Sequence, residues 1–251
     1  MPSPFNGELK MNNVIEKFKA LRLKNCAFNL PDVLDQSASK NLSALQTIDR
    51  LLEIELGCRE KARIDLRFKQ SQLGKKTTID EFNFSHHESR KKEKTRILNL
   101  LNLEFLRDPK DIILIGNPGT GKTFLSRCIA YAATQAGIKT LFTTAMDMIN
   151  HLVAAEVDHT LLKKLKYYQS QDLLVCDEIG YLPLGKQGSN LFFQVISNRH
   201  EKKSTIITTN LPFAKWGDIF DGTTVATAIA DRLVYNSEIL IMEGKSYRKR
   251  S

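Results

Sequence analysis

Eight consecutive residues, Gly116 to Thr123, have the types and spacing that bind the phosphates of a nucleotide. They read GNPGTGKT, fit the pattern G-x-x-x-x-G-K-[ST], follow an apolar run at 112–115 and precede a helix-like segment. Glycine lets the backbone curl so that its N–H groups face the phosphates, and the start of the following helix adds partial positive charge. Lys122 is expected to reach the β- and γ-phosphates, and Thr123 to ligate Mg²⁺. The residues predicted to bind ATP in this loop and just after it are Gly116, Asn117, Pro118, Gly119, Thr120, Gly121, Lys122, Thr123 and Phe124.

Two adjacent carboxylates end a second apolar run. The residues 173–176 read LLVC, and Asp177 and Glu178 follow them directly. We expect Asp177 to hold Mg²⁺, directly or through water, and also to contribute to nucleotide binding. Glu178 is placed to polarise an attacking water as a general base. Together with the phosphate-binding loop, these carboxylates predict a site that hydrolyses ATP.

A third polar group follows another β-branched run. Residues 204–209 read STIITT and are followed by Asn210, which could orient the lytic water. The alternative is that Asn210 only caps the turn that leads into Pro212. Ligands of open α/β sheets bind at the carboxyl ends of the strands, so the three groups of polar residues are expected to converge there.

The elements that must position these residues follow from the apolar pattern after residue 95. Short β-rich runs (DIILIG, IKTLFTT, DLLVCDE, STIITTN and EILIMEG) alternate with helical segments. Strands that alternate with helices predict an α/β fold, with a parallel sheet covered by helices on both faces. The helix after the phosphate-binding loop is expected to end at Gly137.

The N-terminal part of the sequence predicts helices instead. Apolar residues recur at helical spacing from Met11 to Lys24, a turn is expected at 29–32, and a long helix is expected over 41–70. Ser43 and Gln46 have the spacing of a capping box at the start of that helix. We therefore predict a small all-α domain over 1–84 that serves DNA binding or assembly, a linker over 85–95, and an ATPase domain over 96–251.

The long helix carries a strongly basic face. Arg59, Arg63 and Arg67 are four residues apart, so they share one side and could follow a phosphate backbone. The residues predicted to contact DNA, with little sequence preference, are Arg59, Arg63, Arg67, Lys69, Lys75 and Lys76. The alternative is a solvated face whose cations pair with nearby acids. A second basic cluster in the expected linker consists of Arg90, Lys91, Lys92 and Lys94.

Composition narrows the class of protein. The 251 residues include 37 Lys and Arg against 28 Asp and Glu, a net charge of +9 that suits a nucleic-acid partner but also serves solubility alone. The four cysteines lack metal-ligand spacing, which favours reduced structural thiols. No apolar run approaches the roughly 20 residues of a membrane span, and the first residues lack the pattern of a secretory signal. We expect a bacterial cytoplasmic protein with no membrane partner.

Several longer stretches make the pattern more specific. In order they read GNPGTGKT, LLVCDEIGYLPL, SNRHEKKSTIITTNLPFAKW, AIADRL and GKSYR. This set resembles the transposition helper ATPases of the IstB type, relatives of the DnaC helicase loader and of DnaA within the AAA+ superfamily. The resemblance covers essentially the whole chain, although His200 stands where the family often has Tyr, and Tyr235 where it often has His. It implies an AAA+ sheet in the ATPase domain and the same roles for the residues already singled out, with Asn210 as sensor 1.

The resemblance also assigns two arginines. Arg232 resembles the arginine finger that completes a neighbouring subunit's site, and Arg248 resembles sensor 2, which contacts the nucleotide. An arginine supplied across an interface neutralises charge on the γ-phosphoryl group, which would couple hydrolysis to assembly. The alternatives are a salt bridge of Arg232 with Asp231 or another carboxylate, and a basic tail at Arg248.

The function implied is that of an ATPase whose ATP-bound form oligomerises, as a ring or spiral, on double-stranded DNA and presents the target to a transposase. Hydrolysis would then reset or disassemble it. The alternative within the class is a DnaC-like loader, which would bind a replicative helicase and single-stranded DNA. A small-molecule kinase would need an arginine-rich lid, and a nucleotide-dependent scaffold would show negligible turnover.

Overall fold

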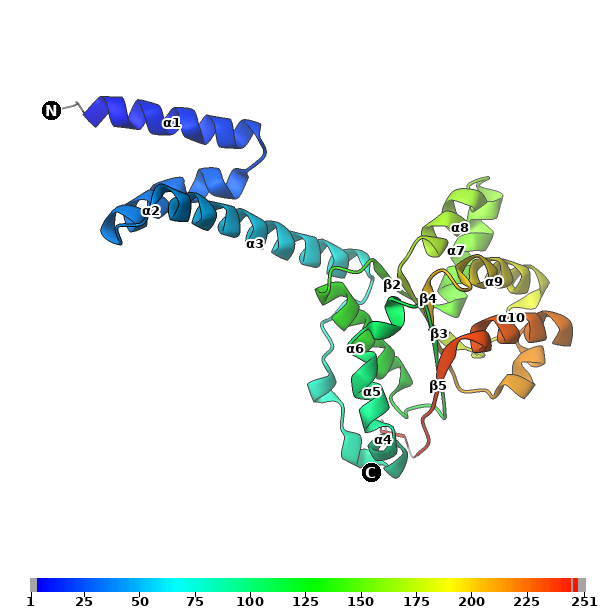
Figure 1. Cartoon of the computed structure of the whole chain (residues 1–251). Helices are drawn as coiled ribbons and strands as arrows, with labels where there is room; N and C mark the ends of the chain where they lie inside the picture. Colours follow the sequence, from blue (N-terminus) through cyan, green and yellow to red (C-terminus); the bar gives the residue numbers. More distant parts are fainter. Residues whose placement is uncertain (1–3, 245, 248–251) are drawn as a thin grey trace. The chain divides into compact units, whose positions relative to one another are not determined.

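The computed structural model describes residues 4–244, 246 and 247, with side chains from residue 11 onward. The chain divides into two compact units, one ending at Asp65 and the other beginning at Leu66 (Figure 1). Arg248 lies outside the described residues. Within the described part of the chain, no helix combines the length and the apolar character that crossing a membrane requires.

The first unit is built from α1 (Pro4–Ala20), α2 (Lys24–Ser39) and most of α3 (Ala44–Gln70). Its core contains Cys26, Leu30, Val33 and Leu51. The predicted capping box is confirmed, because the Ser43 N–H donates to Gln46 Oε1 over 2.8 Å and the Gln46 N–H donates to Ser43 Oγ over 3.2 Å.

The turn expected at 29–32 is wrong, because α2 continues through Pro31. Proline removes one backbone donor from a helix, which weakens it locally. Here Leu30 and Val33 are both buried in the core of the first unit, on either side of the proline. Burial of these side chains stabilises the helix through Pro31. The proline in the sequence predicts a break, because the local sequence does not show this tertiary burial.

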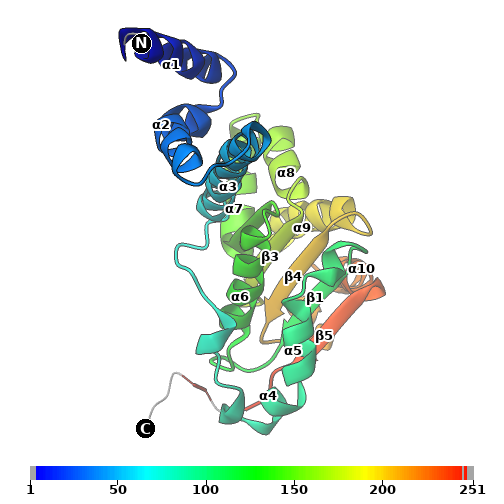
Figure 2. The same cartoon turned by 60° about the vertical axis from the view of Figure 1, so that its left-hand side comes forward.

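The second unit contains a five-stranded parallel sheet, which confirms the predicted α/β class. Its strands are β1 (Asp111–Ile115), β2 (Thr140–Thr144), β3 (Leu173–Ile179), β4 (Ser204–Thr209) and β5 (Ser237–Ile241). Their order across the sheet is β2-β3-β4-β1-β5, so β1 lies between β4 and β5 (Figure 2). The phosphate-binding loop follows β1 and therefore leaves the sheet next to the end of β4.

Helices cover both faces of the sheet, as the alternation of strands and helices predicts. Along β1, Ile112 and Leu114 face one core and Ile113 faces the other, because successive side chains of a strand point to opposite sides. In Figure 1, α5 (Lys94–Leu100) and α6 (Lys122–Gln135) lie on one side of the sheet. The helices on the opposite side are α7 (Ala145–Val157), α8 (Leu161–Gln169), α9 (Gly185–Arg199) and α10 (Thr223–Tyr235). The helix after the phosphate-binding loop ends before Gly137, whose φ of 73° is the left-handed value expected there.

The segment between α3 and β1 belongs to the second unit, which revises the predicted division at 84 and 95. Leu73 and Phe82 are buried in the same core as Ile112 and Leu114. The predicted linker 85–95 is largely helical. The short elements of this region are η1 (Ile79–Glu81), η2 (Phe84–His86), α4 (Glu88–Lys92) and η3 (Glu104–Leu106). A further one, η4 (Phe213–Asp218), lies beyond β4. The sequence predicts a linker over 85–95 because these residues are mostly charged, although a few apolar side chains of the surrounding segment pack it into the core of the second unit.

Candidate functional site

The phosphate-binding loop connects β1 to α6. Gly119 and Gly121 have φ values of 81° and 99°, which side chains rarely permit. Gly116 is required for a different reason, because a Cβ there would lie 2.1 Å from the carbonyl oxygen of Met242. Lys122 Nζ donates to the carbonyl oxygens of Gly116, over 2.6 Å, and Asn117, over 3.0 Å. The lysine therefore lies within the loop, where its charge can meet the phosphates of a nucleotide.

Asp177 lies at the end of β3, beside the first turn of α6. The carboxylate is buried, and its Oδ1 accepts a hydrogen bond of 3.1 Å from Thr123 Oγ1. The described residues contain no group of three or more His, Cys, Asp and Glu side chains that could hold a metal ion by themselves. Thr123 and Asp177 nevertheless fit Mg²⁺, which usually takes one or two protein oxygens and completes its shell with water and phosphate oxygens.

Thr208 on β4 is a residue that the sequence analysis missed. Its hydroxyl donates to Asp177 Oδ1 and accepts the backbone N–H of Glu178 over 2.9 Å. It thus fixes both acidic residues from the neighbouring strand. The position lies inside a run of β-branched residues, and no local signal distinguishes it from the others.

The carboxylate of Glu178 is exposed although both of its neighbours in β3 are buried. The register between β3 and β4 shifts between Cys176 and Ile179, and Glu178 has a φ of 60°. This irregularity presents Glu178 in a cavity of about 200 Å³ at the carboxyl edge of the sheet. The cavity is lined by Pro118, Gly119, Lys122, Thr123, Glu178, Tyr181, Thr208, Thr209 and Asn210. The structure therefore brings the residues predicted from three separate strands to one place.

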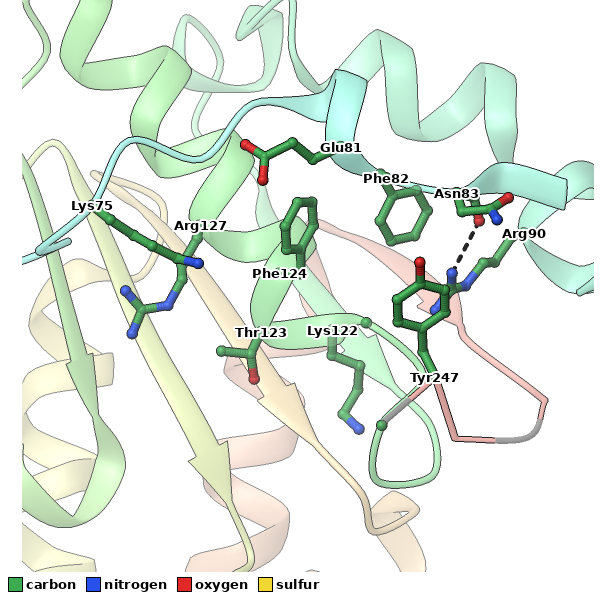
Figure 3. Close-up of a pocket in the computed structure, with 12 residues that line it drawn as sticks. Lys75, Glu81, Phe82, Asn83, Arg90, Lys122, Thr123, Phe124, Arg127 and Tyr247 are labelled. Atoms are coloured by element: carbon green, nitrogen blue, oxygen red, sulfur yellow. Dashed lines mark hydrogen bonds between the residues drawn. The ribbon is translucent and has the colours of Figure 1, made fainter. Parts of the chain in front are cut away.

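A second cavity, of about 330 Å³, shares part of the phosphate-binding loop with the first (Figure 3). Its lining is Lys75, Glu81, Phe82, Asn83, Arg90, Gly119, Gly121, Lys122, Thr123, Phe124, Arg127 and Tyr247. Aromatic rings beside the phosphate loop suit the nucleoside part of a nucleotide. Sequence reasoning found the loop and Phe124 but gave no nucleotide-binding role to the residues at 81–83, 90 and 247. It placed Arg90 in a basic cluster, and Tyr247 lies within the GKSYR stretch.

Lys75 was predicted to contact DNA, but it lines this second cavity. Arg90 also differs from the basic cluster in which the sequence placed it. Its side chain is buried, with 4% of the residue exposed, and burial lowers its pKa below the usual value. The neighbouring Lys91 and Lys92 are exposed, because they lie on the outer side of α4.

The remaining cations predicted on α3 are partly paired. Arg59 Nε lies 2.7 Å from Glu55 Oε1, and Arg63 Nη2 lies 2.7 Å from Glu60 Oε1. Arg67 Nε donates to the carbonyl oxygen of Gly137 over 3.3 Å. Two of the three arginines are therefore paired with nearby acids, as the alternative to DNA binding proposed. Lys69 and Lys76 are exposed.

Arg232 lies on α10 and lines neither of the two cavities. Its Nη1 donates to the carbonyl oxygen of Ala228 over 2.8 Å, and its guanidinium lies 4.6 Å from the centre of the Phe193 ring. In the described part of the chain it forms no ion pair with Asp231. The sensor 2 assignment of Arg248 falls outside the described residues.

The chain matches a known protein family. A sequence model of the family described as IstB-like ATP binding protein matches residues 16–251. The chain is 36% identical to an ATP-binding protein of insertion sequence IS232 from Bacillus thuringiensis subsp. berliner, over 91% of this chain and 90% of that protein. It is 37% identical to an ATP-binding protein of insertion sequence IS5376 from Geobacillus stearothermophilus, over 86% and 85% of the two chains.

The fold is similar to that of two solved structures. A crystal structure of the DnaC helicase loader matches with a TM-score of 0.57 and 24% identity, covering 66% of this chain and 96% of that one. DnaA from Aquifex aeolicus, bound to AMPPCP, matches with a TM-score of 0.57 and 21% identity, covering 70% and 53% of the two chains. The fold is therefore similar to that of the DnaC loader and of DnaA, the two relatives that the resemblance named. Given the family match over most of its length, the chain belongs to the IstB-like ATP-binding proteins of insertion sequences.

Proposed function

We propose that this protein is a Mg²⁺-dependent ATPase that assembles on duplex DNA and delivers the target to the transposase of its insertion sequence. The observation that carries the hydrolytic part is the shared cavity of Lys122, Thr123, Glu178 and Asn210 beside the buried carboxylate of Asp177. A site that only bound ATP would not need an exposed carboxylate at that position. The relatives are named as ATP-binding proteins of insertion sequences, which supports the link to transposition.

Each residue of the site has a distinct part in the reaction. Lys122 and the loop N–H groups bind the β- and γ-phosphates. Thr123 and Asp177 would hold Mg²⁺, which would supply positive charge to those phosphates. Glu178 accepts a proton from the attacking water, and Asn210 holds that water in line with the γ-phosphate. Tyr181 lines the same cavity from the loop after β3.

The assembly part of the proposal rests on charge and on an incomplete site. The net charge of +9 suits a polyanion, and Lys69 and Lys76 are exposed. Arg232 lies outside both cavities of its own chain, so a role on the γ-phosphate requires that it act on a neighbouring subunit. ATP would then be bound between subunits, and hydrolysis would loosen the assembly.

Measuring ATP hydrolysis with and without duplex DNA tests the proposal. We expect Lys122→Ala to lose nucleotide binding, because the loop loses its phosphate-binding cation. Glu178→Gln should bind ATP but hydrolyse it at least a hundredfold more slowly, since catalysis by a general base contributes about 10²–10⁴. The matched controls are Lys186→Ala and Glu104→Gln, exposed residues that line neither cavity.

The same variants separate the candidate functions. Glu178→Gln should accumulate as ATP-bound oligomers on duplex DNA, which electron microscopy would reveal. Hydrolysis that duplex DNA does not stimulate would contradict the helper function. A preference for single-stranded DNA, together with binding of a replicative helicase, would instead support the loader alternative.

A further inference from the structure

Arg90 is a buried cation to which the predicted chemistry gives no role. It lies in α4, and none of the described carboxylates forms an ion pair with it. Its Nη1 donates to the carbonyl oxygen of Asn83 over 3.0 Å, and its Nη2 donates to that of Thr120 over 2.6 Å. A buried guanidinium without an acid depends on hydrogen bonds to offset the cost of burial, and here the acceptors are these two carbonyl groups.

The bond to Thr120 reaches into the phosphate-binding loop itself. The carbonyl of Thr120 and the N–H of Gly121 belong to one trans peptide group and therefore point in opposite directions. By holding the carbonyl on its own side, Arg90 directs the Gly121 N–H away from itself. The approach is close, because a Cβ on Gly121 would lie 3.0 Å from Arg90 Nη2 and 2.9 Å from the Phe82 ring. Glycine at a φ of 99° has little conformational preference of its own, so this peptide needs an external restraint.

The same guanidinium connects two other segments. Its central carbon lies 4.6 Å from the centre of the Phe82 ring and 5.6 Å from that of the Tyr247 ring. The backbone N–H of Tyr247 in turn donates to the carbonyl oxygen of Gly119 over 2.9 Å. Figure 3 shows Arg90 beside Phe82, Asn83 and Tyr247 at one end of the cavity. The chain before α4, the phosphate-binding loop and the chain after β5 thus meet at one side chain.

We propose that Arg90 is a positioning residue of the nucleotide site, which fixes the Gly121 N–H toward the phosphates by holding the Thr120 carbonyl. Phe82 and Tyr247 keep the guanidinium in place, so the phosphate-binding loop is restrained from the nucleoside side of the cavity. The proposal rests on nucleotide binding at this loop and deepens it. Arg90 does not contact the reacting atoms and acts only through the loop.

Two ligands distinguish a residue that positions the phosphate-binding loop from one that contacts the nucleoside. Binding of ATP and of inorganic triphosphate, which has no base or sugar, would be measured by calorimetry on the full chain. Arg90→Met should weaken both ligands by similar factors of about tenfold to hundredfold, as expected when a hydrogen bond from a charged group is lost. Arg90→Lys keeps the charge but has a single nitrogen, so its affinities for both ligands should lie between those of the parent chain and of Arg90→Met. Lys91→Met, an exposed neighbour on α4 paired with Glu88, is the matched control and should bind as the parent chain does.

A second measurement observes the peptide directly. In protein labelled with ¹⁵N-glycine, ATP should protect the Gly121 amide from hydrogen exchange in the parent chain. This protection should be lost in Arg90→Met and reduced, but not abolished, in Arg90→Lys. Unchanged protection, or weaker binding of ATP alone with normal binding of triphosphate, would overturn the proposal. If Arg90→Met fails to fold, Arg90→Lys decides the question by the same two readouts. Failure of the parent chain to bind ATP would instead refute the nucleotide function itself.

Discussion

At the scale of single residues, the proposed hydrolytic site contains one hydroxyl that belongs to no motif. Thr208 Oγ1 donates to Asp177 and accepts the N–H of Glu178, so it aligns the proposed magnesium ligand and supports the left-handed backbone of the proposed general base. Loss of a partner that orients a metal ligand in this way typically costs about 10- to 100-fold in metal affinity or activity.

Replacement of this hydroxyl gives a prediction at the residue scale. Thr208→Val keeps the shape of the side chain but removes both hydrogen bonds, so kcat should fall by about tenfold or more. The Kd for ATP should change little, because the two hydrogen bonds of the Thr208 hydroxyl go to Asp177 and Glu178 and not to the phosphate-binding loop. Steady-state kinetics and equilibrium binding measure the two quantities. Thr208→Ser retains the hydroxyl and should restore kcat; equal activities of the valine variant and the parent chain would contradict this assignment.

At the scale of elements, Glu55 on α3 links two helices of the first unit, because it caps the start of α2. The Glu55 carboxylate is buried and accepts the N–H groups of Asn25 and Cys26, over 2.8 and 3.1 Å, as well as Nε of Arg59. Burial alone would raise the pKa of Glu55, but the hydrogen bond from Arg59 and those from the two backbone groups hold it below the ordinary value. Negative charge at the start of a helix also suits its dipole.

This cap predicts a pH-dependent stability. Because the folded-state pKa of Glu55 is depressed, its contribution is present above the unfolded-state pKa and is lost as pH falls through the folded-state value. Glu55→Gln should lower the free energy of unfolding at neutral pH by about 1–2 kcal/mol. The difference between the two proteins should narrow below about pH 4, where the unfolded carboxyl titrates. Denaturant titrations at several pH values measure this, with the exposed Glu53→Gln as the control; a difference independent of pH would exclude the charge as its cause.

At the scale of the whole molecule, the excess of cations bears on DNA binding. Arg59 is a poor residue for testing it, because its loss would leave the buried Glu55 without its partner. Lys69 and Lys76 are exposed, and within the described residues neither forms an ion pair. They are therefore the cleaner probes of the predicted phosphate contacts.

The prediction at this scale concerns salt dependence. The full chain should bind duplex DNA with an affinity that falls steeply as salt rises, because each phosphate contact releases counterions. Lys69→Ala and Lys76→Ala should each reduce the slope of log K against log salt by about one, and uniformly across DNA sequences. Fluorescence anisotropy over a range of salt concentrations measures the slope, and Lys186→Ala serves as the control. A slope that neither lysine variant alters would remove these residues from the interface.

The local features of the site could be predicted from the sequence because each is encoded by neighbouring residues. The phosphate-binding loop, the acidic pair near the end of β3, the amide after β4 and the capping box at Ser43 are contiguous patterns, each recognisable from a few positions. The alternation of strands and helices likewise predicts a parallel sheet, which brings the strand ends to one edge.

Tertiary structure decided what depends on single residues from distant segments. Arg90, Phe82 and Tyr247 meet at the loop although more than 150 residues separate the first two from the third. Burial of Leu73 and Phe82 moved the boundary between the units into α3, and burial around Pro31 kept α2 continuous. These outcomes depend on which apolar side chains share a core and on which donor reaches a given carbonyl. Such contacts join residues that are far apart in the chain, so the local spacing of residues in the sequence does not indicate them.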